Sequence, residues 1–285
     1  MTNAQKNRII DKSFQAFGVV CTFFGLAILA VLIYNIFEEG LSRINWDFIT
    51  NLPSRRPQKA GIYTAVMGTI WILVMTTLIA FPLGVGAGIY LEEYTKKTKL
   101  ASLLEINIAN LAGVPSIIYG LLGLEIFVRI FGLGGSLLAG SLTLSLLILP
   151  IIIVATREAL KAVPSSIKDA SMALGASKWQ TIWNQTLPAS IGGVLTGVIL
   201  AISRAIGETA PLIVVGALAY VPFAPSSPMD EFTVMPIQIF NWVSRPQHGF
   251  AVNASAAIIV LLLITFMMNG IAVYFRNKWQ KKIKW

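Results

Sequence analysis

The chain has 285 residues, of which 55% are hydrophobic and only 12% are charged, with a formal net charge of +9. Soluble domains carry about a quarter charged residues, so this composition argues against a water-soluble globular protein. A positive charge can indicate nucleic-acid binding, but here the basic residues are spread over segments between long apolar stretches. We therefore expect a membrane protein with no nucleic-acid partner.

Six apolar stretches are long enough to cross a bilayer. A hydrocarbon core about 30 Å thick requires roughly 20 apolar residues in a helix. The sequence therefore predicts an all-α membrane protein with six transmembrane helices in one domain over 17–275, between a cytoplasmic N-terminal segment over 1–16 and a basic cytoplasmic tail over 276–285. The six stretches lie at 17–37, 63–90, 100–130, 138–156, 191–218 and 251–275.

The distribution of basic residues sets the predicted orientation. With a cytoplasmic N-terminus, the inside segments carry fifteen of the 22 Lys and Arg residues, the outside loops carry five, and two lie near or within spans. Cytoplasmic loops of membrane proteins carry an excess of Lys and Arg, so both termini are expected in the cytoplasm. The five outside residues are Arg43, Arg55, Arg56, Lys59 and Arg245.

The first stretch contains Cys21, the only cysteine, which excludes an intrachain disulfide. We expect this thiol to act as a small apolar side chain. The stretch is long for a signal-peptide core and no small-x-small cleavage site follows it cleanly, so it is predicted to be a retained helix. The only histidine, His248, has no Cys or His partners, and no metal site is predicted.

The second and third stretches both contain helix-perturbing residues. Pro82 is followed by Gly84, Gly86 and Gly88, and small residues let helices approach closely in lipid, so this face is expected to pack against another helix or a partner subunit. The third stretch contains GVPS over 113–116. Proline disfavours helix at the preceding residue, which predicts either a kink or a helix that restarts at Ser116, where the free N–H groups would favour an anion.

Residues 157–188 form the largest inside loop. Pro164 and the two serines after it read as a helix start, and the short helix that follows should end at Gly175. A second helical piece over 178–187 is expected to carry Trp179, Ile182 and Trp183 on one face. Such a pair of helices can lie on the membrane or dock to a soluble partner. The last outside loop, 221–250, is rich in proline and is expected to lack long regular structure.

The fifth stretch contains an acid and a base within hydrocarbon. Arg204 and Glu208 are four residues apart, so on a helix they share one face and can pair. A charge at the bilayer centre costs roughly 2.5–3.5 kcal/mol. The pair is either a structural salt bridge or, as we expect, a mark of a hydrated path in which Arg204 binds an oxyanion. Glu125 and Arg129 repeat the spacing near the outer end of the third stretch, as a vestibule pair or a pair near the headgroups.

The inside loop resembles the EAA loop of ABC-importer permeases. That pattern combines an acid, two small residues, a glycine and a terminal Leu-Pro. Three positions depart from it: Asp169 stands for Glu, Ser171 for Ala, and Gln185 for an apolar residue. The matching positions are Asp169, Ala170, Ser171, Gly175, Leu187 and Pro188.

A closer resemblance, over most of the chain, is to the PstA family of phosphate-importer permeases. It is carried by RAIGETAP at 204–211, which PstA shares with its sister family PstC, and by GVPSIIYG at 113–120. The choice of PstA over PstC rests on the second stretch, in particular FPLGV at 81–85 and YLEEY at 90–94. The resemblance implies a type I ABC-importer permease in the bacterial inner membrane, with phosphate as its substrate.

The resemblance also implies partners and site residues. It implies a heterodimer with PstC, two copies of the ATPase PstB, and the phosphate-binding protein PstS. No Gly-x-x-x-x-Gly-Lys-Ser/Thr sequence occurs, so this chain is expected to be no enzyme and to bind no cofactor, with ATP and Mg on the partner ATPase. The implied ATPase-coupling residues are Asp169, Ala170, Ser171, Leu174 and Gly175. The implied substrate path comprises Arg204, Glu208, Thr209, Ser116 and Tyr119.

Three alternatives remain open at the level of sequence. The same architecture could carry another oxyanion, such as molybdate or sulfate. The chain could be a secondary transporter that uses Glu208 as a proton relay, or a sensor or scaffold subunit that transports nothing.

Overall fold

The computed structural model describes residues 3–96, 98–218 and 220–280, and these form an almost entirely helical chain. Residues 1–2 of the expected N-terminal segment and 281–285 of the expected tail lie outside the described residues. The main helices are α1 (Asn3–Gly40), α3 (Tyr63–Ile89), α4 (Lys99–Leu111), α5 (Ser116–Gly123), α6 (Leu137–Lys161), α9 (Leu187–Ala205), α10 (Ala210–Val215) and α12 (His248–Gln280).

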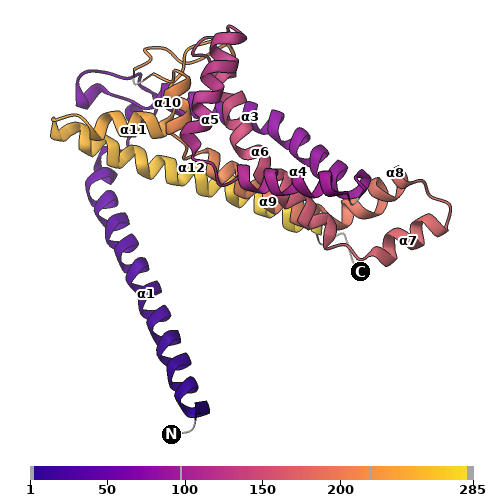
Figure 1. Cartoon of the computed structure of the whole chain (residues 1–285). Coiled ribbons are helices and arrows are strands. Elements are labelled where there is room, and N and C mark those ends of the chain that lie inside the picture. Colours follow the sequence, from indigo (N-terminus) through magenta and orange to yellow (C-terminus); the bar gives the residue numbers. More distant parts are fainter. Residues whose placement is uncertain (1–2, 97, 219, 281–285) are drawn as a thin grey trace.

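Shorter helical pieces flank this set. At one end lie α2 (Trp46–Thr50) and α11 (Met235–Val243), and at the other lie α7 (Ser165–Ala173) and α8 (Lys178–Thr181) (Figure 1). Four other short helical segments are also present. They are η3 (Tyr90–Tyr94), which continues α3; η4 (Leu124–Ile130), which continues α5; η5 (Ile182–Thr186), which joins α8 to α9; and η2 (Pro57–Lys59).

Six membrane crossings are present if one bent pair counts as a single span. Within the described residues, five helical segments are long and apolar enough to cross a membrane, and the sixth crossing consists of 99–111 and 116–130, which meet at 101°. This confirms the predicted all-α membrane protein with six spans. Because each helix satisfies its own backbone hydrogen bonds, such spans are stable in lipid, where no water replaces a missing partner.

The centre of the bundle is α6, packed between α3 and α9. The small residues of α3 face α6: a Cβ on Gly84 would lie 2.6 Å from the Ile152 side chain, and one on Gly88 would lie 2.7 Å from Thr156. Gly197 of α9 approaches Ala155 of α6 in the same way. The predicted close packing of the Gly-rich face is therefore confirmed for two of its glycines, whereas a Cβ on Gly86 would meet nothing within 4 Å.

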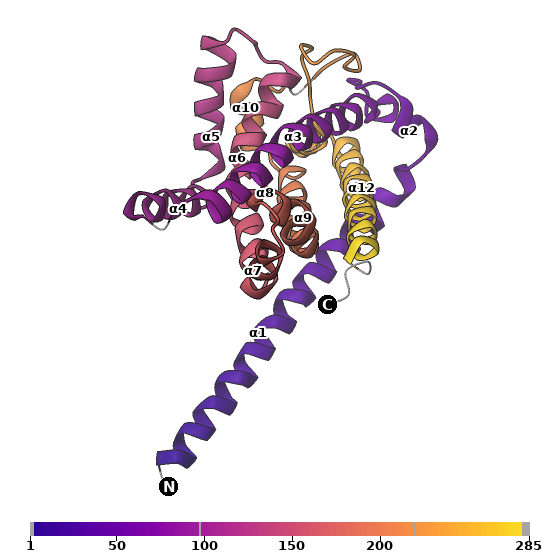
Figure 2. The ribbon, with the colours of Figure 1, turned by 90° about the vertical axis from the view of Figure 1, so that its right-hand side faces the viewer.

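Helix α1 leaves the bundle and projects away from it (Figures 1 and 2). Only its C-terminal end contacts α12, where Glu39 accepts a hydrogen bond from the Ser255 hydroxyl at 3.1 Å. None of the apolar window of this helix is buried within the chain. A helix that is apolar on all sides requires lipid or another protein around it.

The last outside loop contains a helix that the sequence reading missed. Proline predicts irregular structure in this loop, but Pro236 stands in the first turn of α11, where a proline needs no N–H partner. Met235 and Trp242 of this helix are buried, and Trp242 packs near Phe48 and Phe250. The expectation of a loop without long regular structure over 221–250 is therefore wrong in its second half.

The packing of α3 on α6 can be tested with two glycines of the same helix. Gly88→Ala should lower the melting temperature of the purified protein, because overpacking a tight contact costs about 1–3 kcal/mol. Gly86→Ala gains the same helix propensity but meets open space, so its melting temperature should stay level or rise. Thermal unfolding monitored by size-exclusion chromatography measures the melting temperatures of both variants. Equal shifts of the melting temperature in the two variants would contradict the described contact.

Candidate functional site

The fifth span is interrupted after Arg204. Helix α9 ends at Ala205, residues 206–209 form a turn, and α10 begins at Ala210. Pro211 explains the break, because it has no N–H for the carbonyl of Gly207 and is tolerated only in the first turn of a new helix. The backbone of the turn is satisfied locally, since Gly207 N–H donates to Arg204 O and Glu208 N–H to Ala205 O.

Arg204 and Glu208 pair across this break. The Arg204 Nε lies 3.4 Å from the Glu208 Oε1. The predicted pairing is therefore confirmed, but the expectation that both lie on one face of a continuous helix is wrong, because Glu208 follows the end of α9. The turn replaces the helical geometry and turns the two side chains toward different environments.

The two members of the pair differ in exposure. The Arg204 side chain is 42% exposed at the surface of this chain, whereas the Glu208 side chain is 15% exposed. Glu208 lines a small, largely apolar pocket with Thr69 and Leu73 of α3. Among the contacts within the described residues, only the Nε of Arg204 has a partner. The terminal nitrogens of a guanidinium held in place by a carboxylate can thus bind a further anion.

The third span is interrupted at the predicted motif. Helix α4 ends at Leu111 and α5 begins at Ser116, so the restart at Ser116 is confirmed in preference to a simple kink. The Tyr119 hydroxyl donates to the carbonyl of Leu111 at 2.8 Å and ties the two halves together. Tyr119 is buried and its proton is engaged within the chain, which leaves only its lone pairs for any other partner.

The two interrupted spans meet each other. Gly120 of α5 lies against Pro211 of α10, where an added Cβ would come within 2.7 Å of the Pro211 Cα. Tyr119, Ile206 and Leu212 belong to one buried cluster. The middle of α5 is therefore packed against the start of α10, which follows Thr209 directly.

Three further predicted residues have ordinary surroundings. Thr209 precedes α10, but its side chain makes no capping hydrogen bond. Glu125 and Arg129 form an ion pair of 2.9 Å with both side chains more than half exposed. Exposed pairs of this kind are worth little, and this one shares no contact with Arg204.

The predicted coupling residues lie on a helical hairpin, α7–α8, that stands off the bundle at the end opposite α11 (Figure 1). Gly175 ends α7 with a φ of +87°, a conformation that suits glycine. Asp169 and Ala170 are exposed and Leu174 is 90% exposed. The hairpin thus presents a mixed apolar and charged surface that no part of the described chain covers.

Ser171 stabilises this hairpin from within. Its hydroxyl lies 3.0 Å from the hydroxyl of Thr181 in α8. Trp179 and Trp183 stack with ring centroids 5.7 Å apart and stay exposed, whereas Ile182 is buried. The expectation that all three share a face is therefore wrong, because the π-helical turn η5 directs Ile182 toward the bundle.

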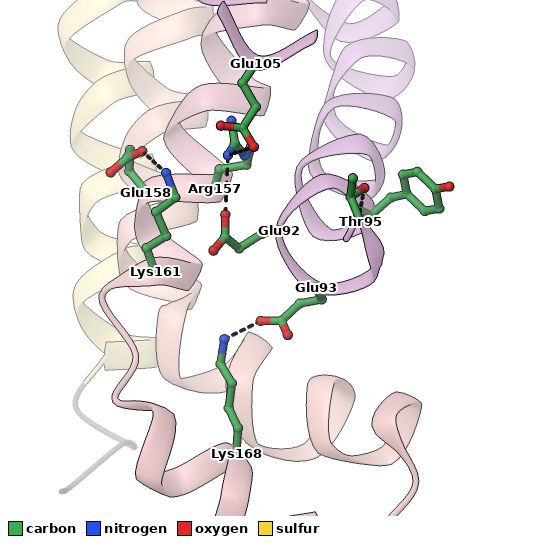
Figure 3. A network of polar contacts seen from close by, with 9 residues as sticks. Glu92, Glu93, Thr95, Glu105, Arg157, Glu158, Lys161 and Lys168 are labelled. Carbon is green, nitrogen blue, oxygen red and sulfur yellow. Dashed lines mark hydrogen bonds and ion pairs between the residues drawn. The ribbon is translucent and has the colours of Figure 1, made fainter. Parts of the chain in front are cut away.

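A network of charged residues near the hairpin was not singled out by the sequence reading. Arg157 at the end of α6 is 7% exposed and lies between two carboxylates (Figure 3). Its Nη2 is 2.7 Å from Glu105 of α4 and 3.6 Å from Glu92 of η3. Arg157 counted only as a basic loop residue in the sequence. Its position four residues from the buried Ile153 of the same helix was the signal that could have placed it inside.

The fold is shared with chains of two solved ABC transporters. The permease chain of a bacterial alginate ABC transporter has the same fold, with a TM-score of 0.70 and 13% identity over 97% of this chain and 98% of that chain. The corresponding chain of the MetNI methionine ABC transporter gives a TM-score of 0.61 with 17% identity over 76% of this chain and 97% of that one.

The family follows from the sequence match. The model of the family described as binding-protein-dependent transport system inner membrane component matches residues 80–281, and the chain belongs to this family. It is 33% identical to the phosphate transport system permease protein PstA of Yersinia pestis, over 96% of this chain and 91% of that protein. It is 32% identical to the probable ABC transporter permease protein YqgI of Bacillus subtilis, over 91% of this chain and 93% of that protein. The chain is therefore a multi-pass inner-membrane permease subunit of an ABC importer.

The hydrogen bond between the Tyr119 hydroxyl and the Leu111 carbonyl, which joins the two halves of the third span, can be tested directly. Tyr119→Phe removes the donor to Leu111 O, and a lost hydrogen bond costs about 0.5–1.5 kcal/mol net. The melting temperature of the purified complex should fall. Tyr274→Phe is the matched control, because Tyr274 is 64% exposed. Equal melting temperatures for the two variants would show that the Tyr119 hydroxyl does not hold α4 to α5.

Proposed function

We propose that this permease subunit carries inorganic phosphate and that Arg204 stands on the substrate path. The observation that carries the proposal is the exposed guanidinium at the break of the fifth span, fixed by Glu208 at 3.4 Å. A charge held within a membrane span usually marks a pathway, because an idle one costs free energy. The neighbouring break at Ser116 provides a second place in the membrane where backbone N–H groups are not used by a continuous helix.

The chemistry of the pair favours phosphate over other oxyanions. The planar guanidinium binds two oxygens of a tetrahedral anion at once. Hydrogenphosphate also carries a proton near neutral pH, and the Glu208 carboxylate can accept a hydrogen bond from it. Sulfate has no such proton and would meet the carboxylate as a like charge. Ser116, Tyr119 and Thr209 would line the same path from the facing helix ends.

The relatives support both the substrate and the partners. The Yersinia pestis protein is named as a phosphate transport permease, and it covers nearly the whole chain. The proposed complex contains a PstC-type sister permease, two PstB-type ATPase subunits that bind ATP and Mg, and a PstS-type binding protein. In this complex the exposed surface of the hairpin, formed by Asp169, Ala170, Ser171, Leu174 and Gly175, docks onto the ATPase. Lipid surrounds the spans.

The proposal predicts the behaviour of Arg204 variants in proteoliposomes that contain the whole complex. Arg204→Ala should lower ATP-driven phosphate uptake by about tenfold or more, because hydrogen bonds to charged groups contribute about 1.5–3 kcal/mol. Arg204→Lys keeps the positive charge but loses the planar guanidinium that can bind two oxygens at once, so its phosphate uptake should lie between that of the wild type and that of Arg204→Ala. Arg129→Ala is the control, since Arg129 has the same i to i+4 carboxylate partner on an exposed surface, and it should transport normally.

Three outcomes would contradict the proposal. Full phosphate uptake by an assembled Arg204→Ala complex would remove Arg204 from the path. ATP hydrolysis and uptake stimulated by sulfate or molybdate, but not by phosphate, would assign another oxyanion. Uptake by this chain alone, driven by a pH gradient without an ATPase, would replace the importer with a secondary transporter.

A further inference from the structure

The cytoplasmic end of α3 carries two consecutive carboxylates that contact different helices. Glu92 and Glu93 lie in η3, a π-helical turn that continues α3 without a break. Glu92 faces Arg157 of α6 at 3.6 Å, and Glu93 faces Lys168 of α7 at 2.5 Å. Figure 3 shows the two contacts next to each other, with Arg157 above Glu92 and Lys168 below Glu93. One turn therefore joins the bundle to the hairpin.

The contact between Glu93 and Lys168 is shielded from water. The Glu93 side chain is 9% exposed and that of Lys168 is 20% exposed. Ion pairs at this depth are screened less than surface pairs, and the loss of one partner leaves the other charge uncompensated. The contrast is the pair between Lys161 and Glu158 on α6, whose side chains are 42% and 64% exposed.

Both helices of the hairpin contact η3. Lys168 belongs to α7, whereas Lys178 at the start of α8 places its ammonium 5.2 Å from the centre of the Tyr94 ring. Cation–π contacts of this kind add to the attraction between the two elements. The turn η3 is thus held to the hairpin at two points, one from each helix.

Arg157 extends the connection to the third span. It binds Glu92 of η3 and Glu105 of α4 with one guanidinium, and its side chain is 8% exposed. The cluster holds three carboxylates, Glu92, Glu93 and Glu105, against two cations, Arg157 and Lys168. Loss of Arg157 leaves Glu92 and Glu105 without their shared partner, and reversal of Lys168 places a second carboxylate against Glu93.

We infer that η3 is the junction through which the hairpin moves the transmembrane helices. Lys168 and Glu93 are positioning residues: they hold α7 to the end of α3, so that a displacement of the hairpin by the ATPase displaces α3 as well. Arg157 passes the same displacement to α4, which is the first half of the interrupted span in the proposed path. The inference rests on the proposed importer function, in which a separate ATPase drives this chain.

The test is a charge-reversal cycle in the reconstituted complex. Phosphate uptake and ATP hydrolysis are measured together, and their ratio is compared for Lys168→Glu, Glu93→Lys and the double variant. Each single variant should lower the ratio about tenfold while hydrolysis continues, within the coupling energies found in one ion-pair network. The double variant, with the pair reversed, should restore most of the ratio. A merely structural role would lower uptake and hydrolysis together and leave the ratio unchanged.

Lys161→Glu is the matched control. It makes the same charge change, but within the described residues the Lys161 ammonium forms an ion pair only with Glu158 of its own helix, so the ratio should stay at the wild-type value. Assembly is checked by copurification of the ATPase. If a reversal prevents assembly, Lys168→Gln removes the charge without adding an opposing one and carries the same expectation of a lowered ratio. Unchanged ratios in the single variants, or no recovery in the double variant, would overturn the inference.

A second readout separates this inference from the assignment of phosphate. If the wild-type complex hydrolyses ATP but takes up no phosphate, the substrate is wrong and the junction is still testable. Spin labels are placed at Ser166 of α7 and Ser102 of α4 in a Cys21→Ser background. In the otherwise wild-type chain, the distance between the two labels should stay constant through the ATP cycle, because the junction moves α7 and α4 together. The distance should change with ATP after Lys168→Glu. A distance that changes equally in both would overturn the junction.

Discussion

In a bilayer a helix can end only where the protein itself supplies hydrogen-bond partners for the backbone N–H and C=O groups at that end, and this constraint governs the whole molecule. Helices end at two places that matter for the site: at 112–115, between the two halves of the bent third span, and at 206–209, directly after the fifth span. At these ends the backbone is satisfied in part by local turns and by the Tyr119 hydroxyl, and α5 packs against α10. The charged pair of Arg204 and Glu208 lies at one of these breaks, where a continuous helix would have placed both side chains on one face.

The sequence predicted the apolar spans and the restart of the third span at Ser116 for physical reasons that act locally, but it did not predict the break at 206–209. Apolar length indicates a crossing. A proline can mark a helix start, as Pro115 and Pro211 show, although Pro82 and Pro150 lie inside continuous helices. The residues of the site were named correctly as a pair. The sequence could not predict in which direction each of the two side chains points, because the turn between them depends on tertiary packing. In the structure Glu208 lines a pocket beside α3, whereas Arg204 stays exposed.

The same limit explains the misreadings. Ile182 was grouped with two tryptophans by α-helical spacing, but the wider π-helical turn places it in the interior. Arg157 was read as one of many basic loop residues, although it is the centre of an ion network. Its partners Glu92 and Glu105 come from two other helices, and long-range pairing of this kind leaves no mark in the local sequence. The helix α11 was missed because prolines near it resembled a loop.

The projection of α1 gives the molecule a natural reporter. The single thiol of the sequence, Cys21, is exposed on this rod, and everything else in the chain is thiol-free. A maleimide dye attached there senses whatever covers the rod, whether acyl chains or a neighbouring polypeptide, without any engineered substitution. The emission of such a dye would follow subunit association in native vesicles, and its quenching by lipid-borne nitroxides would map how deeply that part of the rod is immersed.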